Sequence, residues 1–205
     1  MRGARETSSQ FSCGPGFHQE RFVQTEMISH EHKCIFVHQR KCAGCSIINA
    51  FGFDVDDPEW HFMNDGVLSP EYQDAPNYFK FAVVRNPWDR FVSGWKYLES
   101  TRAQSLRQVL TKLPESGKDY RHLTRPQSAT LFDGSGRLIV DYLIRFESLQ
   151  QGFDEVCEVI GKPRRRLPHL NQTARDHYRN YFDDECRELF LRHFARDVEI
   201  FGYQY

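Results

Sequence analysis

The segment most informative about the fold reads Cys34-Ile35-Phe36-Val37-His38-Gln39-Arg40-Lys41-Cys42-Ala43-Gly44-Cys45-Ser46. Its apolar beginning predicts a buried β-strand over residues 34–38, and a helix is expected over residues 45–51. We call the turn between them, residues 38–46, the first corner. A loop between a strand and a helix often holds a phosphate-like anion, because backbone N–H groups point into it and the helix dipole favours negative charge. Lys41 adds a movable positive charge.

The order of residues in the first corner differs from that of the phosphate-binding loop of nucleoside triphosphatases. That loop carries two glycines five positions apart, followed by Lys and then by Ser or Thr. In this chain Lys41 precedes Gly44 instead. The first corner therefore predicts an anion-binding turn of another kind.

A second apolar run followed by a helix reads Phe79-Lys80-Phe81-Ala82-Val83-Val84-Arg85-Asn86-Pro87-Trp88-Asp89-Arg90-Phe91-Val92-Ser93-Gly94-Trp95. Residues 79–85 suit a buried parallel strand. Pro87 suits the first turn of a helix, and apolar residues at helical spacing predict that helix over residues 87–99. We call residues 85–93 the second corner.

Basic and hydroxyl side chains stand at both corners. Arg85 ends the second strand, and Ser93 lies about two turns into the helix that follows. In an open α/β sheet, ligands bind at the carboxyl ends of the strands. Two corners of this kind predict a ligand with two anionic ends.

Both corners resemble those of the sulfotransferases that use 3′-phosphoadenosine 5′-phosphosulfate (PAPS), in the branch of the carbohydrate sulfotransferases and their small bacterial relatives. That branch typically shows H-I-P-K-T-A-G-T-S where this chain has residues 38–46. It shows V-R-N-P-x-x-R-x-x-S at the second corner, matched here by Val84, Arg85, Asn86, Pro87, Arg90 and Ser93. Downstream, residues 144–149 resemble its R-F-E-N-L segment, and residues 167–173 resemble its closing segment. The resemblance covers roughly residues 33–205 and implies a P-loop-like α/β fold, with a central parallel sheet flanked by helices.

The resemblance implies how PAPS, the sulfuryl donor, and its product adenosine 3′,5′-bisphosphate (PAP) are bound. Lys41 neutralises the charge that grows on the leaving phosphate, while backbone N–H groups and the Ser46 hydroxyl meet the 5′-phosphosulfate. Arg85 and Ser93 bind the 3′-phosphate. Arg90 either serves the same phosphate or forms a salt bridge on the helix surface. The residues expected to bind the nucleotide are Arg40, Lys41, Cys42, Ala43, Gly44, Cys45, Ser46, Arg85, Ser93, Thr173 and Arg175.

A histidine is the expected base that takes the proton of the acceptor. His61 is the first choice, because small relatives often carry a histidine ahead of the second strand. His122 is the second choice, because residues 122–127 resemble an H-x-x-P-Q segment of carbohydrate-modifying members. A histidine that is merely hydrogen-bonded in the core or at the surface is an alternative for both. Glu147 is expected to be structural, pairing with Arg145 or a neighbouring backbone group.

The chain departs from the family pattern at Cys42 and Cys45, where threonine is usual. A thiol donates a weaker hydrogen bond than a hydroxyl, so one anion contact is expected to be weakened. A C-x-x-C pair at a helix start also suggests lowered thiol pKa values and a disulfide that forms on mild oxidation. Small thiols that only pack the loop are the alternative. A zinc site that also recruits His30, His32 and Cys34 is disfavoured, because no second C-x-x-C follows, and no metal is expected.

Strands that alternate with helices predict a parallel α/β sheet. Further elements are expected as helix 103–113, strand 138–145, helix 149–160 and helix 184–195, with a turn at residues 133–136. The 205 residues suggest a flexible N-terminal arm over residues 1–30 and a single sulfotransferase domain over residues 31–205. The formal net charge of −1 gives no footprint for nucleic acid, and no apolar run suits a membrane span or a signal peptide. We therefore expect a cytoplasmic protein.

The resemblance implies an enzyme that moves a sulfuryl group in line from PAPS to a hydroxyl or amine of a small-molecule or carbohydrate acceptor. One alternative is a protein that binds PAPS or PAP but is catalytically weak, which the Cys-for-Thr changes permit. A kinase of the P-loop type is a less favoured alternative. It is disfavoured because no Walker-type loop and no obvious magnesium-binding carboxylate follow a strand.

Overall fold

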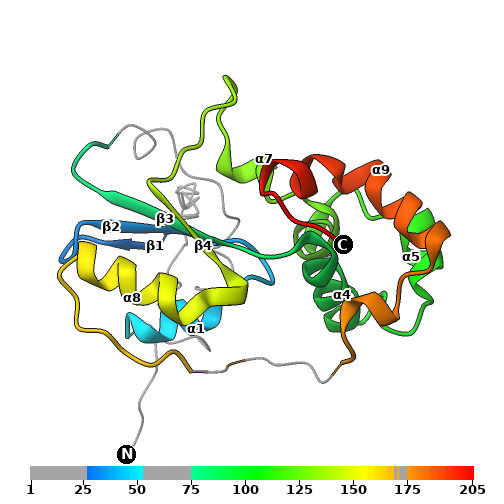
Figure 1. Ribbon diagram of the computed structural model, residues 1–205, viewed down its shortest axis with the longest axis horizontal. Coiled ribbons are helices and arrows are strands. Elements are labelled where there is room, and N and C mark those ends of the chain that lie inside the picture. The colour runs from blue at the N-terminus through cyan, green and yellow to red at the C-terminus, as the bar shows by residue number, and fades with distance from the viewer. Residues whose placement is uncertain (1–26, 53–74, 169, 171–174) are drawn as a thin grey trace, which may run out of the picture.

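A four-stranded, mostly parallel sheet forms one part of the computed structural model, which describes residues 27–52, 75–168, 170 and 175–205 (Figure 1). The strand order is β1-β2-β3-β4. The short β1 (Met27–Ser29) pairs antiparallel with β2 (Cys34–Val37), and the parallel strands that follow are β3 (Phe79–Val84) and β4 (Tyr142–Arg145). The register pairs Phe36 with Phe81, and Val84 with Arg145.

Helices cover both faces of the sheet, because side chains alternate between the faces along each strand. Helices α1 (Gly44–Ala50) and α8 (Leu149–Val159) pack on one face (Figure 1). The apolar residues between them and the sheet include Phe36, Ile47, Phe81, Ile144 and Phe153. The short α7 (Ser128–Leu131) and the chain end near Phe201 pack on the other face, against Ile35, Val37, Ala82 and Val84.

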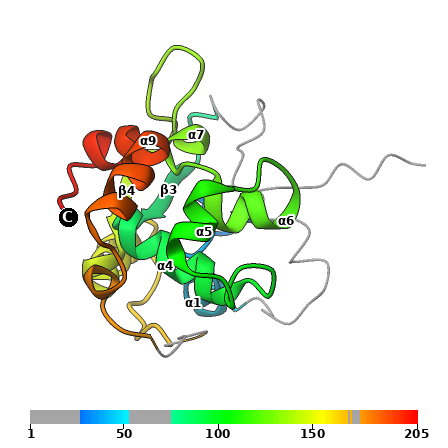
Figure 2. The same ribbon diagram turned by 90° about the vertical axis from the view of Figure 1, so that its right-hand side faces the viewer.

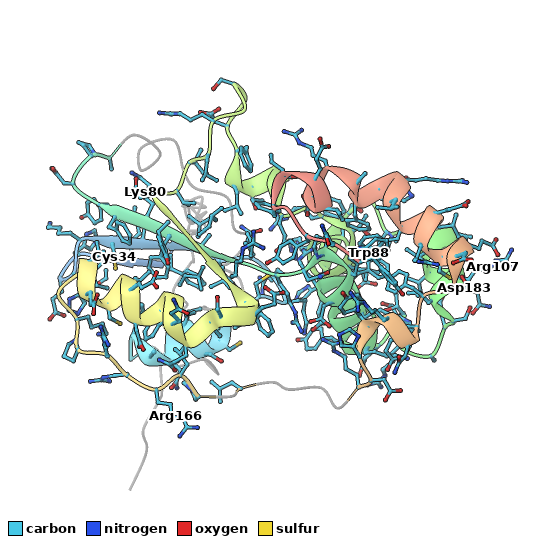
Figure 3. All side chains as sticks on the ribbon, in the orientation of Figure 1. Cys34, Lys80, Trp88, Arg107, Arg166 and Asp183 are labelled. Carbon is cyan, nitrogen blue, oxygen red and sulfur yellow. The ribbon has the colours of Figure 1, made fainter. Side chains whose placement is uncertain are left out.

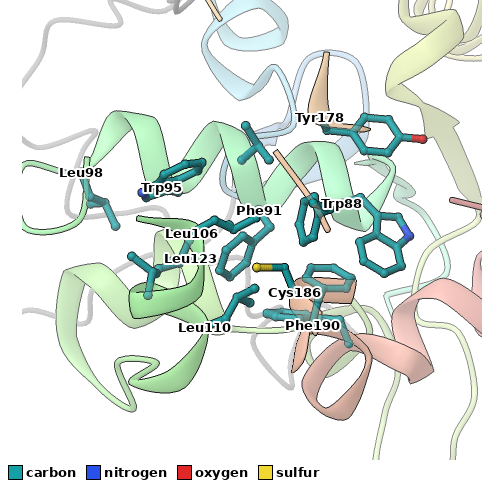
Figure 4. Packing of buried hydrophobic residues seen from close by; sticks show 14 residues of the cluster. Trp88, Phe91, Trp95, Leu98, Leu106, Leu110, Leu123, Tyr178, Cys186 and Phe190 are labelled. Atoms are coloured by element: carbon teal, nitrogen blue, oxygen red, sulfur yellow. The ribbon is translucent and has the colours of Figure 1, made fainter. Parts of the chain in front are cut away.

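A second, helical part lies beside the sheet and contains its own aromatic core (Figures 2 and 4). Its main helices are α4 (Pro87–Tyr97), α5 (Leu106–Thr111) and α9 (Asp184–Ile200). Shorter turns complete it: α6 (Gly117–Asp119), the π-helical η1 (Tyr120–Thr124) and the 3₁₀ turn η3 (Tyr178–Asn180). The ring of Trp88 stacks on that of Phe190 with centroids 4.0 Å apart. Figure 3 shows Trp88 in this part and Cys34 in the sheet part.

Most of the expected elements are confirmed, with shifted ends. The expected strand 138–145 begins only at Tyr142, and Leu138 instead forms an isolated bridge with Phe132 that closes a turn. This confirms the turn expected at residues 133–136. The expected helix 103–113 is shorter, because Ser105 and Gln108 form a capping box at its start. The expected helix 184–195 continues to Ile200.

Two regions differ more strongly from the expectation. Strand β1 lies inside the range that was expected to be a flexible arm, and the rest of that arm lies outside the described residues. The expected loop between α5 and β4 contains α6, η1 and α7. These elements are too short to show a clear periodic pattern in sequence. None of the described helices is long and apolar enough to cross a membrane.

Candidate functional site

The carboxyl ends of the three parallel strands lie at one edge of the sheet. The first corner follows β2, the second follows β3, and the 3₁₀ turn η2 (Phe146–Ser148) follows β4. Because parallel strands all end at the same edge, the two predicted corners meet there. This edge is the candidate functional site.

The backbone of the first corner is tightly folded. Lys41 and Ala43 have φ angles of 68° and 59°, in the left-handed region that residues other than glycine seldom adopt. At Gly44 a Cβ atom would lie 1.9 Å from Nε2 of the buried His38. Position 44 therefore requires glycine because the imidazole packs directly against the helix start.

The ammonium group of Lys41 rests on an aromatic ring. Its Nζ lies 3.7 Å from the ring centroid of Tyr97, a contact that favours the charged form. Burial, and next the positive charge of Arg85, nevertheless lower the pKa of Lys41 to about 8. Tyr97 is 44% exposed, so this lysine lies at the rim of the site. Tyr97 was not among the predicted site residues.

Arg85 of the second corner is held by protein groups on several sides. Its Nε and Nη2 donate to Oδ2 of Asp89 at 2.7 and 2.6 Å, and its Nη1 donates to the carbonyl oxygen of Lys41 at 2.8 Å. Its Cζ lies 3.9 Å from the ring centroid of Phe146. A guanidinium has five N–H donors, so two remain beyond these three hydrogen bonds. Arg85 thus fastens the first corner and retains donors for a ligand.

Asp89 connects Arg85 to Arg175. Nη2 of Arg175 donates to Oδ1 of Asp89 at 2.6 Å, so the structure brings this predicted residue to the second corner. Burial is the main cause that lowers the pKa of Arg85, and the positive charge of Arg175 acts in the same direction. Asp89 was missed by the sequence reasoning, although its position four residues after Arg85 was an available signal.

Arg90 is buried and does not lie on the helix surface. It is 3% exposed, and its Nε donates to the carbonyl oxygen of Arg40 at 3.0 Å. The expected alternative of a surface salt bridge is therefore wrong. The carbonyl groups of Arg40 and Lys41 are each bound by an arginine of the second corner, which holds the two corners together.

The end of β4 supports the second corner, as expected for Glu147. Its Oε1 accepts a hydrogen bond from the backbone N–H of Asn86 at 2.8 Å, and its Oε2 accepts one from the hydroxyl of Tyr203 at 2.9 Å. Arg145 instead donates to the carbonyl oxygen of Phe201 at 2.7 Å. Glu147 is therefore structural and pairs with a backbone group.

Hydrogen bonds correct two expectations for the first corner. The backbone N–H of Ser46 donates to the carbonyl oxygen of Ala43 at 3.0 Å. Of the two donors of Ser46, its hydroxyl therefore stays a predicted ligand contact and its backbone N–H does not. The thiol of Cys42 is fully buried and donates to Oε1 of Gln127 at 3.3 Å. Burial raises the pKa of Cys42 to about 11, so the expected lowering is wrong for this thiol. Cys42 and the half-buried Cys45 are both free cysteines.

One of the two candidate bases lies among the described residues. His61, like Thr173, lies outside them. The ring of His122 stacks on that of Tyr97, with centroids 5.4 Å apart, and its Nδ1 lies 2.9 Å from the carbonyl oxygen of Lys118. A carbonyl only accepts, so Nδ1 carries the proton and Nε2 the lone pair. Burial lowers the pKa of His122 to about 4, which keeps the ring neutral at pH 7.

Ser93 lies on the buried face of α4 and is 7% exposed. Beside it, a Cβ atom on Gly94 would lie only 2.6 Å from the carbonyl oxygen of His122. The glycine therefore allows η1 to pack against α4. This contact places His122 next to the helix of the second corner.

Among the described residues, no group of three or more His, Cys, Asp and Glu side chains is arranged to hold a metal ion. The histidines of the alternative zinc site have other neighbours. Nδ1 of His30 lies 2.7 Å from the hydroxyl of Tyr78, and Nε2 of His32 lies 3.4 Å from Nζ of Lys162. These contacts give no support to a site that joins these histidines to the thiols of the first corner.

Two of three comparisons with known proteins gave a match. A model of the family described as "Sulfotransferase family" matches residues 24–204. A solved structure described as a sulfotransferase from Alicyclobacillus acidocaldarius is similar at 18% sequence identity and a TM-score of 0.38, covering 84% of this chain and 87% of that one. A search of curated proteins found no match.

Proposed function

Because the chain belongs to the sulfotransferase family, we propose that it moves a sulfuryl group from PAPS to a hydroxyl or amine of a small-molecule or carbohydrate acceptor. The observation that carries this proposal is that Lys41, Arg85 and Arg175 lie close together at the carboxyl ends of the parallel strands. Arg85 and Arg175 both pair with the carboxylate of Asp89, and both lie close enough to Lys41 to lower its pKa. PAPS supplies an activated sulfuryl group and carries anionic groups at both ends.

The charges of the site fit such a ligand. The pKa of Lys41 is lowered by burial and then by Arg85, with a further contribution from Arg175. An anion bound between these groups would relieve their mutual repulsion and would favour the charged form of the lysine. The two N–H donors that remain on Arg85 suit a phosphate oxygen pair. Gly44 and Cys45, in the first turn of α1, are placed to direct backbone N–H groups at the 5′ end.

Lys41 acts on the leaving phosphate in this proposal. Its long side chain leaves the face of Tyr97 and neutralises the negative charge that develops as the sulfuryl group departs. Arg85 and Ser93 hold the 3′-phosphate, and Arg175 adds positive charge near it. Cys42 makes no ligand contact through its thiol, because that thiol is hydrogen-bonded to Gln127. The exchange of threonine for cysteine there therefore gives little support to a catalytically weak protein.

The acceptor's proton goes to a histidine, either His61 or His122. His122 has an unprotonated Nε2 on a neutral ring, as a base needs before the reaction, but its pKa of about 4 makes it a weak proton acceptor and favours His61. The variants His61→Gln and His122→Gln separate the two candidates. The base is the residue whose loss lowers kcat strongly while binding of PAP, measured by calorimetry, stays close to that of wild type.

Sulfate transfer from radiolabelled PAPS to a mixed metabolite extract tests the function directly, and mass spectrometry of the labelled products identifies the acceptor class. We expect labelled products with wild type and none with Lys41→Ala. PAP binding without any labelled product, across extracts that contain hydroxyl and amine acceptors, would overturn the transferase proposal and leave a nucleotide-binding protein. Absence of PAP binding would overturn the nucleotide assignment as well.

A further inference from the structure

Gln127 is a fully buried residue that contacts both corners of the site. Its side-chain Oε1 accepts hydrogen bonds from the backbone N–H of Arg85 at 2.9 Å and from the thiol of Cys42 at 3.3 Å. Its Nε2 donates to the carbonyl oxygen of Arg85 at 2.9 Å. One amide group therefore binds both backbone groups of Arg85 and a side chain of the first corner.

The position of Arg85 explains why such a partner is needed. The last ladder pair of β3 joins Val84 to Arg145, so Arg85 lies just beyond the sheet. It is nevertheless 8% exposed, and buried backbone groups without partners are costly. The amide of Gln127 supplies one donor and one acceptor, as a neighbouring strand would. It thereby fixes the direction in which the side chain of Arg85 leaves the backbone.

Gln127 is itself anchored from the helical part of the molecule. Its backbone N–H donates to Oδ2 of Asp197 at 2.6 Å, and the backbone N–H and hydroxyl of Ser128 donate to Oδ1 at 3.0 and 2.5 Å. Asp197 lies on α9 and is 1% exposed, so these donors compensate a buried carboxylate. A continuous chain of hydrogen bonds runs from α9 through Gln127 to Arg85, and from Arg85 to the carbonyl oxygen of Lys41.

We propose that Gln127 is a positioning residue of the sulfuryl-transfer site, which sets the placement of Arg85 and, through it, of Lys41. The inference rests on the proposed function in that Lys41 and Arg85 are taken as the groups that meet the nucleotide. Without the amide, the backbone of Arg85 loses two hydrogen bonds, and its guanidinium no longer has a fixed approach to Lys41. The groups that act on the charge of Lys41 are Arg85, Arg175, Cys42, Cys45 and the ring of Tyr97.

The test compares Gln127→Met, which keeps the volume but removes the amide, with Ser128→Ala as a matched control. Ser128 is similarly buried and belongs to the same network, but its hydroxyl contacts Asp197 and not Arg85. Both variants are expected to lower the melting temperature, because each loses buried hydrogen bonds. A loss of stability alone therefore does not distinguish positioning from structure.

Titration of Lys41 makes the distinction without any need for activity. In full-length protein with ¹³C-labelled lysine, the Lys41 signal is assigned by its absence in Lys41→Arg. Wild type should titrate at about pH 8. In Gln127→Met the midpoint should rise by about half a pH unit or more, because Arg85 moves away from the ammonium. Ser128→Ala should titrate like wild type.

Calorimetry with PAP and with adenosine 5′-phosphate (AMP) gives the second readout. Gln127→Met should lower the affinity for PAP relative to AMP about tenfold, because Arg85 no longer meets the 3′-phosphate. If Gln127→Met does not fold, Gln127→Asn, whose neutral amide is too short to reach Arg85, is measured in its place. A folded variant with the Lys41 midpoint and the PAP-to-AMP ratio of wild type overturns the proposal. If wild type itself does not prefer PAP, the proposed function fails, while the titration still tests Gln127.

Discussion

The two corners of the site hold their cations in opposite ways. In the first corner, the ammonium of Lys41 lies over the half-exposed ring of Tyr97, a contact worth about 0.5–2 kcal/mol. In the second corner, the guanidinium of Arg85 makes three hydrogen bonds and stacks on Phe146. A lysine held so weakly can move to a ligand, whereas the arginine cannot leave without breaking a buried network. In the proposed function, the first corner therefore supplies the mobile charge, and the second corner supplies the rigid frame.

Lys41→Ala should show the difference between the two corners most strongly, because it should lower kcat without lowering the melting temperature much. We expect kcat to fall about 10²- to 10³-fold, because the lost charge acts on the transition state. The melting temperature should change little, since Lys41 makes its side-chain contact at an exposed ring. The matched control is Lys96→Ala, which removes a lysine of the same helix as Tyr97 whose Nζ lies 3.6 Å from the ring centroid of Trp95. A near-normal kcat in Lys41→Ala would remove the lysine from the mechanism.

Arg85→Ala should affect binding and stability together. Loss of a charge-assisted contact to the 3′-phosphate should weaken PAP binding by about 1.5–3 kcal/mol, with a smaller loss for AMP. The melting temperature should fall, because Asp89 and the carbonyl of Lys41 lose a buried partner.

Ser93→Ala should lower PAP affinity by about 1 kcal/mol. Equal losses for PAP and AMP, measured by calorimetry, would contradict the assignment of both residues to the 3′-phosphate.

The pH dependence of kcat/KM tests whether the charge of Lys41 is required. The pKa of Lys41 is lowered from its ordinary value to about 8, so the lysine is protonated below that pH and loses its charge as the pH rises through it. We therefore expect kcat/KM to fall above about pH 8, by about tenfold per pH unit. In Lys41→Arg this limb should disappear, because arginine stays charged. A wild-type profile that remains flat to pH 10 would show that the charge of Lys41 is not required.

Tyr97→Leu should give the smallest effect. Removal of the ring face takes away a contact that favours the charged lysine, so the alkaline limb of kcat/KM should move to lower pH by a few tenths of a unit. Tyr97→Phe keeps the ring and should retain the wild-type limb. If both variants shift the limb equally, the tyrosine hydroxyl and not the ring face acts on Lys41.

Much of the fold could be predicted because its elements are local patterns. The apolar runs before each corner and the helical spacing after Pro87 depend on neighbouring residues, and both produced the expected strands and helices. Short elements such as α7 could not be predicted, because four residues show no period. The missed β1 is shorter still and is defined only by its pairing with β2.

In the site, too, local sequence predicted some features and contacts between distant segments determined the others. Sequence alone predicted Lys41 and Arg85 as candidates from their places after the two strands, and the resemblance added Arg175; the structure brings the three residues together. Tertiary structure alone decided the partners from distant segments: Tyr97 under the lysine, Arg175 on Asp89, and Gln127 behind Arg85. It also reversed the expectation for Cys42, since burial, which no local pattern records, outweighs the helix N-terminus. Order along the chain specifies which groups are present, but burial and contacts between distant segments determine their charge, their direction and their freedom to move.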